Sequence, residues 1–152
     1  MRRRSGRAAP PWQRRPAPVD LEGFGRPWLL FRGRGPDRVV MPLPADEAEH
    51  VQLLIESDCT WSAWLQAADT APILQKRISS KGSFVFRHVG EPRQISMQHN
   101  GRGAFSLTGL TLEFGQGERV LSGMGNSSAK GHLEGSTLVH VRADGDWTVT
   151  LL

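Results

Sequence analysis

Short apolar stretches alternate with polar positions along most of this chain, and nearly every stretch ends at glycine, proline, aspartate or asparagine. In three places an apolar stretch meets an Asp or Asn turn and continues beyond it to a large aromatic residue. These places are Leu53–Ser62, Ile95–Ser106 and Val139–Thr148. Asn-Gly and Asp-Gly between alternating apolar positions are strong local signals of a β-hairpin, because both residues tolerate the positive φ of a tight turn. The pattern therefore predicts a β-hairpin that occurs three times.

The aromatic residues after these turns recur at a nearly constant interval. Trp61, Phe105 and Trp147 are 44 and 42 residues apart, an interval typical of structural repeats. Gly and Pro separate the apolar stretches, which suits short antiparallel strands and leaves little room for helix. Only the stretch Ala45–Glu49 suits a single helical turn.

Evenly spaced short strands with turn signals are typical of sandwiches and barrels. We therefore expect an all-β fold, an antiparallel β-sandwich of jelly-roll type built from the repeated hairpins. A β-trefoil is the alternative, because it requires three units of similar length. The third unit is the weakest copy, around Leu133, and this inequality favours the sandwich.

The positive charge is concentrated at the start of the chain. The formal net charge is +4, but the first 18 residues carry six arginines and no other charged residue, which leaves −2 for the other 134. An Arg- and Pro-rich segment with few apolar residues cannot offset the entropy lost on ordering. We expect residues 1–26 to form a disordered tail and residues 27–152 a single β-sandwich domain. The tail could contact nucleic acid phosphates, a partner that we rank below protein.

Sequence motifs of common enzymes and metal sites are absent. The chain has no G-x-S-x-G, H-E-x-x-H, C-x-x-C or Walker loop, which are the usual nucleophile, zinc and phosphate signatures. The single cysteine, Cys59, excludes an intramolecular disulfide. No stretch suits a secretory signal or a membrane span. We expect a cytoplasmic protein without a cofactor or a metal ion.

The histidines allow one catalytic alternative. None of the five stands at a ligand spacing, but His88, His99 and His140 occupy strands that a sheet could bring together. A three-histidine metal or proton-transfer site would then be available. A small His-dependent enzyme is therefore a hypothesis that depends on whether these three side chains converge.

One exposed tryptophan is expected near the first turn. Trp61 and Trp64 are three residues apart, so they would lie on opposite faces of a strand. Because Trp61 matches Trp147 in the repeat, we predict that Trp61 packs in the core and that Trp64 is exposed. An exposed indole can pack on a protein or stack on a sugar. The candidate binding residues are Trp64, His99, Asn100 and Arg102.

The second half of the chain carries a set of turn motifs. They are His99–Ser106 with its His-Asn-Gly turn, Gly123–Asn126, Gly135–Thr137 and Ala143–Val149 with Asp-Gly-x-Trp-Thr. With them, the stretch Gly82–Leu152 resembles a group of uncharacterised bacterial β-sandwich domains. The resemblance implies an accessory module without known catalytic residues, of a kind often found in exported or membrane-attached proteins.

These observations favour a non-enzymatic binding or assembly module. We expect it to engage a protein partner or a second copy of itself through loops or sheet edges, since strand edges are available for pairing. A carbohydrate-binding module and the small His-dependent enzyme are the alternatives.

Overall fold

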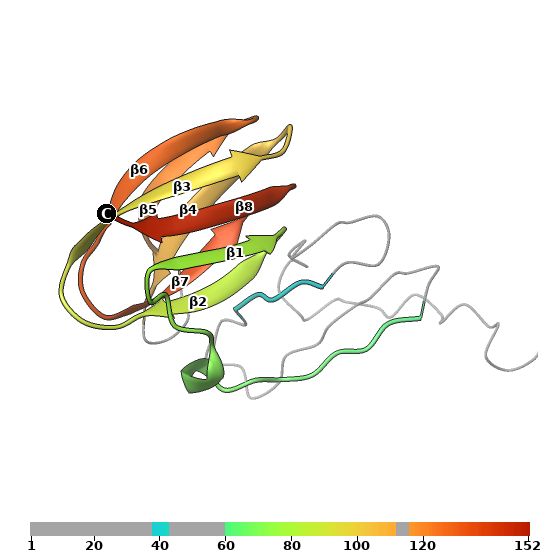
Figure 1. Ribbon diagram of the computed structural model, residues 1–152. Helices are drawn as coiled ribbons and strands as arrows, with labels where there is room; N and C mark the ends of the chain where they lie inside the picture. The colour runs from blue at the N-terminus through green and yellow to red at the C-terminus, as the bar shows by residue number, and fades with distance from the viewer. Residues whose placement is uncertain (1–37, 43–59, 112–115) are drawn as a thin grey trace, which may run out of the picture.

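The computed structural model describes residues 38–42, 60–111 and 116–152. Within these ranges the chain forms eight strands in two facing layers (Figure 1), preceded by one 3₁₀ turn. The elements are η2 (Ala68–Thr70), β1 (Arg77–Lys81), β2 (Phe84–His88), β3 (Arg93–Asn100), β4 (Ala104–Leu110), β5 (Gln116–Met124), β6 (Ser127–Leu133), β7 (Thr137–Arg142) and β8 (Asp146–Leu151).

The strand order is that of a jelly roll. One sheet has the order β1-β8-β3-β6 and the other β2-β7-β4-β5, and every pairing between these strands is antiparallel. The first four strands thus pair with the last four in reverse sequence, as in one long hairpin wrapped into two sheets. The prediction of an antiparallel β-sandwich is confirmed, and the β-trefoil alternative does not describe this topology.

The individual hairpins were predicted wrongly. β3 and β4, on either side of the Asn100–Gly103 turn, lie in opposite sheets, and so do β7 and β8 on either side of Ala143–Gly145. Both turns are therefore corners between the layers. Among the described strands that follow one another, only β4 and β5 pair.

Most of the first expected copy, Leu53–Ser62, lies outside the described residues, as do Ala45–Glu49 and the expected tail 1–26.

Alternating apolar positions of the strands form the core between the sheets. Phe105 and Leu107 of β4 face Met97 of β3 and Val149 of β8 across the layers, and all four are at most 2% exposed. Trp147 is also enclosed, and its indole N–H donates to the carbonyl of Gly82 at 2.9 Å. Burial of each such large side chain contributes about 1.5 to 3 kcal/mol. The apolar side chains recur at every second residue of a strand, so the face that carries them points inward.

Chain segments before β1 cover the edge of β2. The N–H of Leu74 donates to the carbonyl of Arg87 at 2.7 Å, and the N–H of Arg87 donates to the carbonyl of Pro72 at 2.8 Å. Further along the same edge, the N–H of Val40 donates to the carbonyl of Ser83 at 3.1 Å. The backbone groups of this edge are therefore occupied within the chain at Arg87 and Ser83, which opposes pairing with other chains there.

His140 lies on the outer side of β7 and connects to this covering segment. Its Nε2 lies 2.8 Å from the Ser83 hydroxyl, which donates to the carbonyl of Val40 at 3.2 Å. The hydroxyl proton is used by the carbonyl, so Nε2–H donates to the Ser83 oxygen. Burial, with a smaller contribution from the Arg142 cation, lowers the pKa of His140 from 6.5 to about 4.

The His140 environment predicts a loss of stability on acidification. Between pH 6.5 and about 4, the unfolded chain binds a proton at this residue that the folded chain does not. Stability should therefore fall by about 2 kcal/mol as the pH is lowered through this window. Urea unfolding at a series of pH values measures the effect. His140→Gln should flatten the curve in this window and His132→Gln should not, and an unchanged slope in His140→Gln would contradict the assignment.

Candidate functional site

Three turns meet around His99 at one end of the sandwich. His99 is completely buried, and its Nδ1–H donates to the carbonyl of Gly125 in the β5–β6 turn at 2.7 Å. Its ring packs at a tilt on Phe105, with 4.6 Å between centroids. Nε2 lies 3.1 Å from the Asp144 carboxylate but makes no directed hydrogen bond. These two side chains are therefore adjacent without a hydrogen bond between them.

Asp144 connects the β7–β8 turn to the β3–β4 turn. Its carboxylate, about half exposed, accepts the N–H of Gly103 at 2.7 Å and that of Arg102 at 3.3 Å. Burial alone would raise its pKa, but these two donors and the charge of His99 outweigh that effect and lower the pKa of Asp144 below its ordinary value. The cluster therefore stabilises the ionised carboxylate and holds two corner turns together.

The structure separates the predicted binding residues. His99 is fully enclosed, so its side chain is not presented at the surface of this structure, and its contacts link the turns. Asn100 and Arg102 are exposed on the β3–β4 turn, and Trp64 is exposed on the separate segment before η2. Trp61 is 55% exposed, and its predicted place in the core was also wrong.

The three histidines do not converge. His88 faces inward near the opposite end of the sandwich and its Nε2–H donates to the carbonyl of Glu91 at 2.9 Å, whereas His140 contacts Ser83 on the outer side. Within the described part of the chain, no group of three His, Cys, Asp or Glu side chains could hold a metal ion. The predicted three-histidine site is not formed, which removes the cluster on which the His-dependent enzyme hypothesis relied.

The segment Thr60–Ala67 carries large apolar side chains in solvent. It is extended and runs past the sandwich to η2 (Figure 1), and every residue in it is exposed. Trp61, Trp64 and Leu65 are 55%, 62% and 83% exposed, respectively. The segment ends where Thr70 caps the short η2 turn by donating its hydroxyl to the carbonyl of Ala67 at 2.6 Å. We call this stretch the tryptophan segment.

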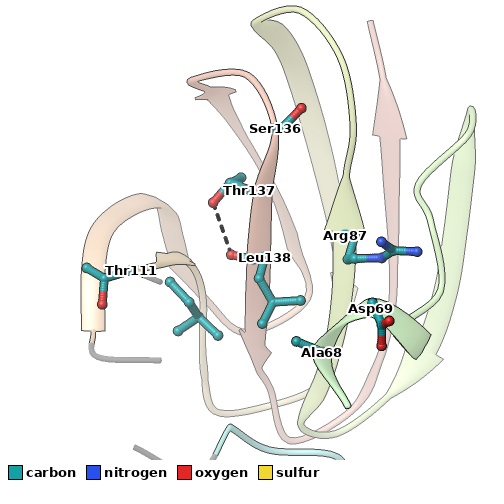
Figure 2. A pocket seen from close by; sticks show the side chains of 8 residues that line it. Ala68, Asp69, Arg87, Thr111, Ser136, Thr137 and Leu138 are labelled. Carbon is teal, nitrogen blue, oxygen red and sulfur yellow. Dashed lines mark hydrogen bonds between the residues drawn. The ribbon is translucent and has the colours of Figure 1, made fainter. Parts of the chain in front are cut away.

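A hollow of about 460 Å³ lies on the outer face of the sheet β2-β7-β4-β5 (Figure 2). Its floor is a row of cross-strand neighbours, with Arg87 on β2 beside Leu138 on β7 and Leu110 on β4. The Arg87 side chain is held in place because its Nε–H donates to the carbonyl of Ala71 at 3.1 Å. The rim residues are Ala68, Asp69, Thr111, Ser136 and Thr137. We call this feature the β7 hollow.

A second, more polar hollow of about 530 Å³ lies on the outer face of the other sheet. It presents hydroxyl, amide and carboxylate groups, which are the groups that bind sugar hydroxyls. Stacking of a sugar also needs an exposed ring, and the aromatic residue in the described lining, Trp147, is only 2% exposed. The lining residues are Ser79, Ser80, Gln98, Asn100, Asp146, Trp147 and Thr148.

Sequence reasoning missed the β7 hollow. Arg87, Leu110 and Leu138 come from three strands that are far apart in the sequence, and only the strand pairing brings them into one row. A signal was nevertheless present. Val139 faces inward, so alternation places residue 138 on the outer face and predicts a polar residue there, but the chain has Leu138.

No protein-family model, curated protein or solved structure matches this chain significantly. The described residues contain no helix that is both long and apolar enough to cross a membrane. The resemblance to bacterial accessory domains therefore stays a prediction.

Proposed function

We propose that this protein is a non-catalytic binding module that engages a protein surface through the tryptophan segment, Thr60–Ala67. The observation that carries the proposal is the exposure of Trp61, Trp64 and Leu65 within five residues. Large apolar side chains gathered at a surface mark interaction sites, and tryptophan is the residue most enriched among those that dominate binding energy.

The extended backbone of this segment fits a known mode of recognition. An extended peptide is bound by main-chain hydrogen bonds, while pockets on the partner receive its side chains. Trp61 and Trp64 are three residues apart and lie on opposite sides of an extended chain. A partner that encloses the segment would therefore contact both indoles, and a partner that lies against one side would contact one.

The free sheet edges support a loop rather than an edge as the binding element. β1 carries exposed Arg77, β6 carries exposed Lys130, and β5 carries exposed Glu118 and Arg119. Charged side chains on edge strands oppose pairing with another sheet. Since the chain itself occupies the β2 edge at Arg87 and Ser83, the exposed tryptophans are the stronger candidate.

The double variant Trp61→Ala/Trp64→Ala tests this function in the full-length chain. Loss of a central tryptophan at an interface costs about 2 kcal/mol or more, so we expect association to weaken by roughly thirtyfold or more. The measurement is the native size of the tagged protein purified from its source cells, followed by titration with the purified partner. Met124→Ala is the matched control, because Met124 is 72% exposed on the distant β5–β6 turn. Equal association of the double variant and the control would refute the proposal.

A further inference from the structure

Two histidines are buried between the sheets with one ring nitrogen left over. His99 and His88 are 0% and 4% exposed. Each has one nitrogen that donates to a backbone carbonyl, that of Gly125 for His99 and that of Glu91 for His88. A carbonyl oxygen only accepts, so this nitrogen carries the proton of the neutral ring. The other nitrogen, Nε2 of His99 and Nδ1 of His88, is buried without a hydrogen-bond partner.

The two remaining nitrogens differ in what they face. Nε2 of His99 lies 3.1 Å from Oδ1 of Asp144, whereas His88 forms no ion pair with the described residues. At 3.1 Å no water molecule fits between the two atoms. The lowered pKa of Asp144 keeps its carboxylate ionised at neutral pH. A neutral His99 would therefore direct the lone pair of Nε2 at an anionic oxygen, and the two acceptors would repel each other.

Asp144 is the charged group that faces the His99 ring. The neighbours on its other sides are uncharged, and they are the ring of Phe105 on β4, the carbonyl of Gly125, and the cross-strand residues Ser127 on β6 and Trp147 on β8. Arg102 approaches with its backbone N–H, which donates to Asp144, and its side chain is exposed. A charge on His99 is therefore matched by one carboxylate, and attraction within such a pair is strong where water is excluded.

Three turns depend on these two side chains. His99 lies near the end of β3 and holds the β5–β6 turn through its Nδ1–H, while Asp144 belongs to the β7–β8 turn and accepts the N–H of Gly103 in the β3–β4 turn. A Cβ at Gly101 would meet both Nε2 and Oδ1, so the backbone of the β3–β4 turn lies directly against the pair. A proton between Nε2 and Oδ1 would join the two halves of this cluster.

We propose that His99 and Asp144 form a proton-operated clasp, in which a second proton on Nε2 of His99 fastens the β3–β4, β5–β6 and β7–β8 turns and its release to solvent loosens them. Histidine suits this role because its charge ordinarily changes between about pH 5 and 8. Asn100 and Arg102 are exposed on the β3–β4 turn, so the surface that they present changes with pH. The inference does not depend on the tryptophan segment.

Nitrogen-15 NMR of the histidine rings in the full-length protein tests the clasp, and His88 is the internal control. As the pH is lowered from about 8.5 to about 5, both ring nitrogens of His99 should become protonated. Nδ1 of His88 should stay unprotonated in the folded protein, because burial without a carboxylate disfavours the charged ring. The amide signals of Gly103 and Arg102 should move together with the His99 ring, and that of Gly90, at the His88 end of the sandwich, should not.

Two variants each remove one negative charge. Asp144→Asn keeps an oxygen acceptor, and its amide N–H can donate to Nε2 of a neutral ring, so the proton affinity of His99 should fall at least about threefold. Asp146→Asn is the matched control, since it replaces an exposed carboxylate two residues away and should leave the proton affinity of His99 unchanged.

Three results would overturn the clasp. One is a His99 ring that keeps a single proton until the protein unfolds. Another is equal proton uptake by His99 in Asp144→Asn and Asp146→Asn. The third is a set of turn amide signals that do not follow the protonation of the ring. If Asp144→Asn does not fold, the comparison of His99 with His88 in the wild-type protein remains the test.

Discussion

Gly145→Ala is expected to lower the free energy of unfolding by about 3 kcal/mol, because there is no room for a methyl group at this turn. A Cβ at this position would meet the carbonyl oxygen of Asn100 and lie 2.7 Å from Cα of Gly101. Both are backbone atoms of the β3–β4 turn, so relief requires the two corner turns to move apart. That movement would also disturb the contacts of Asp144 with Gly103 and His99.

Gly125 provides the matched control for this substitution. It has a φ of +68° and no neighbour within 4 Å of an added Cβ, so Gly125→Ala should cost only the left-handed backbone term of about 1 to 2 kcal/mol. Asparagine separates the two causes, since it tolerates a positive φ but needs space. Gly125→Asn should be nearly neutral and Gly145→Asn at least as damaging as Gly145→Ala. Urea unfolding of the four variants distinguishes steric crowding from backbone strain. A Gly145→Asn variant as stable as the wild type would contradict crowding at Gly145.

Asp144→Ala is expected to destabilise the fold by about 3 kcal/mol. The substitution removes the acceptor of two backbone N–H groups, those of Arg102 and Gly103, and with it the carboxylate that ties the two corner turns together. A hydrogen bond to a charged group contributes about 1.5 to 3 kcal/mol, and the lower value applies to each of these two exposed bonds. Asp144→Asn keeps an oxygen acceptor and should lie between the wild type and alanine.

The Asp144 effect has a pH signature. The folded pKa of Asp144 is below 3.8, so its stabilisation is complete above that value and is lost as the pH falls through the folded pKa. The difference in unfolding free energy between wild type and Asp144→Ala should therefore shrink in strong acid. Asp146→Ala, which removes an exposed carboxylate two residues away, should stay within about 0.5 kcal/mol of wild type. Equal losses in the two alanine variants would show that the turn contacts contribute nothing specific.

The sandwich was predictable because its strands follow a period of two. Polar Ser106 separates Phe105 from Leu107, polar His140 separates Val139 from Val141, and the buried set follows this alternation. The pairing of strands was not predictable in the same way. An apolar stretch, a turn and a second apolar stretch look alike whether the chain returns to the same sheet or crosses to the opposite one, as it does after Asn100.

The turn glycines show a second limit. Glycine was expected at the Asn-Gly and Asp-Gly turns because of a positive φ, but the described glycines with positive φ are Gly82, Gly90, Gly125 and Gly135. A Cβ at Gly101 would meet the side chains of Asp144 and His99, and a Cβ at Gly145 would meet the backbone of Asn100 and Gly101. Both causes place a glycine in the sequence, and only the three-dimensional neighbours distinguish them.

The candidate site was predicted only in part. Trp64 is exposed as predicted, but the prediction relied on Trp61 packing in the core as the match of Trp147 in the repeat. Trp61 is also exposed, and the structure has no strand at Thr60–Ser62 that would place the two rings on opposite faces. His99 was named as a candidate binding residue, and histidine side chains are routinely half exposed. It is buried because Gly125 and Asp144 provide partners from turns that are remote in the sequence.

Photo-crosslinking from position 64 tests the central claim most directly. The full-length chain with benzoylphenylalanine in place of Trp64 is irradiated in its source cells, and the same probe in place of the exposed Met124 serves as the control. The account predicts a protein adduct from position 64 that position 124 does not give. Absence of any protein adduct from position 64 would contradict the assignment of the tryptophan segment as the binding surface.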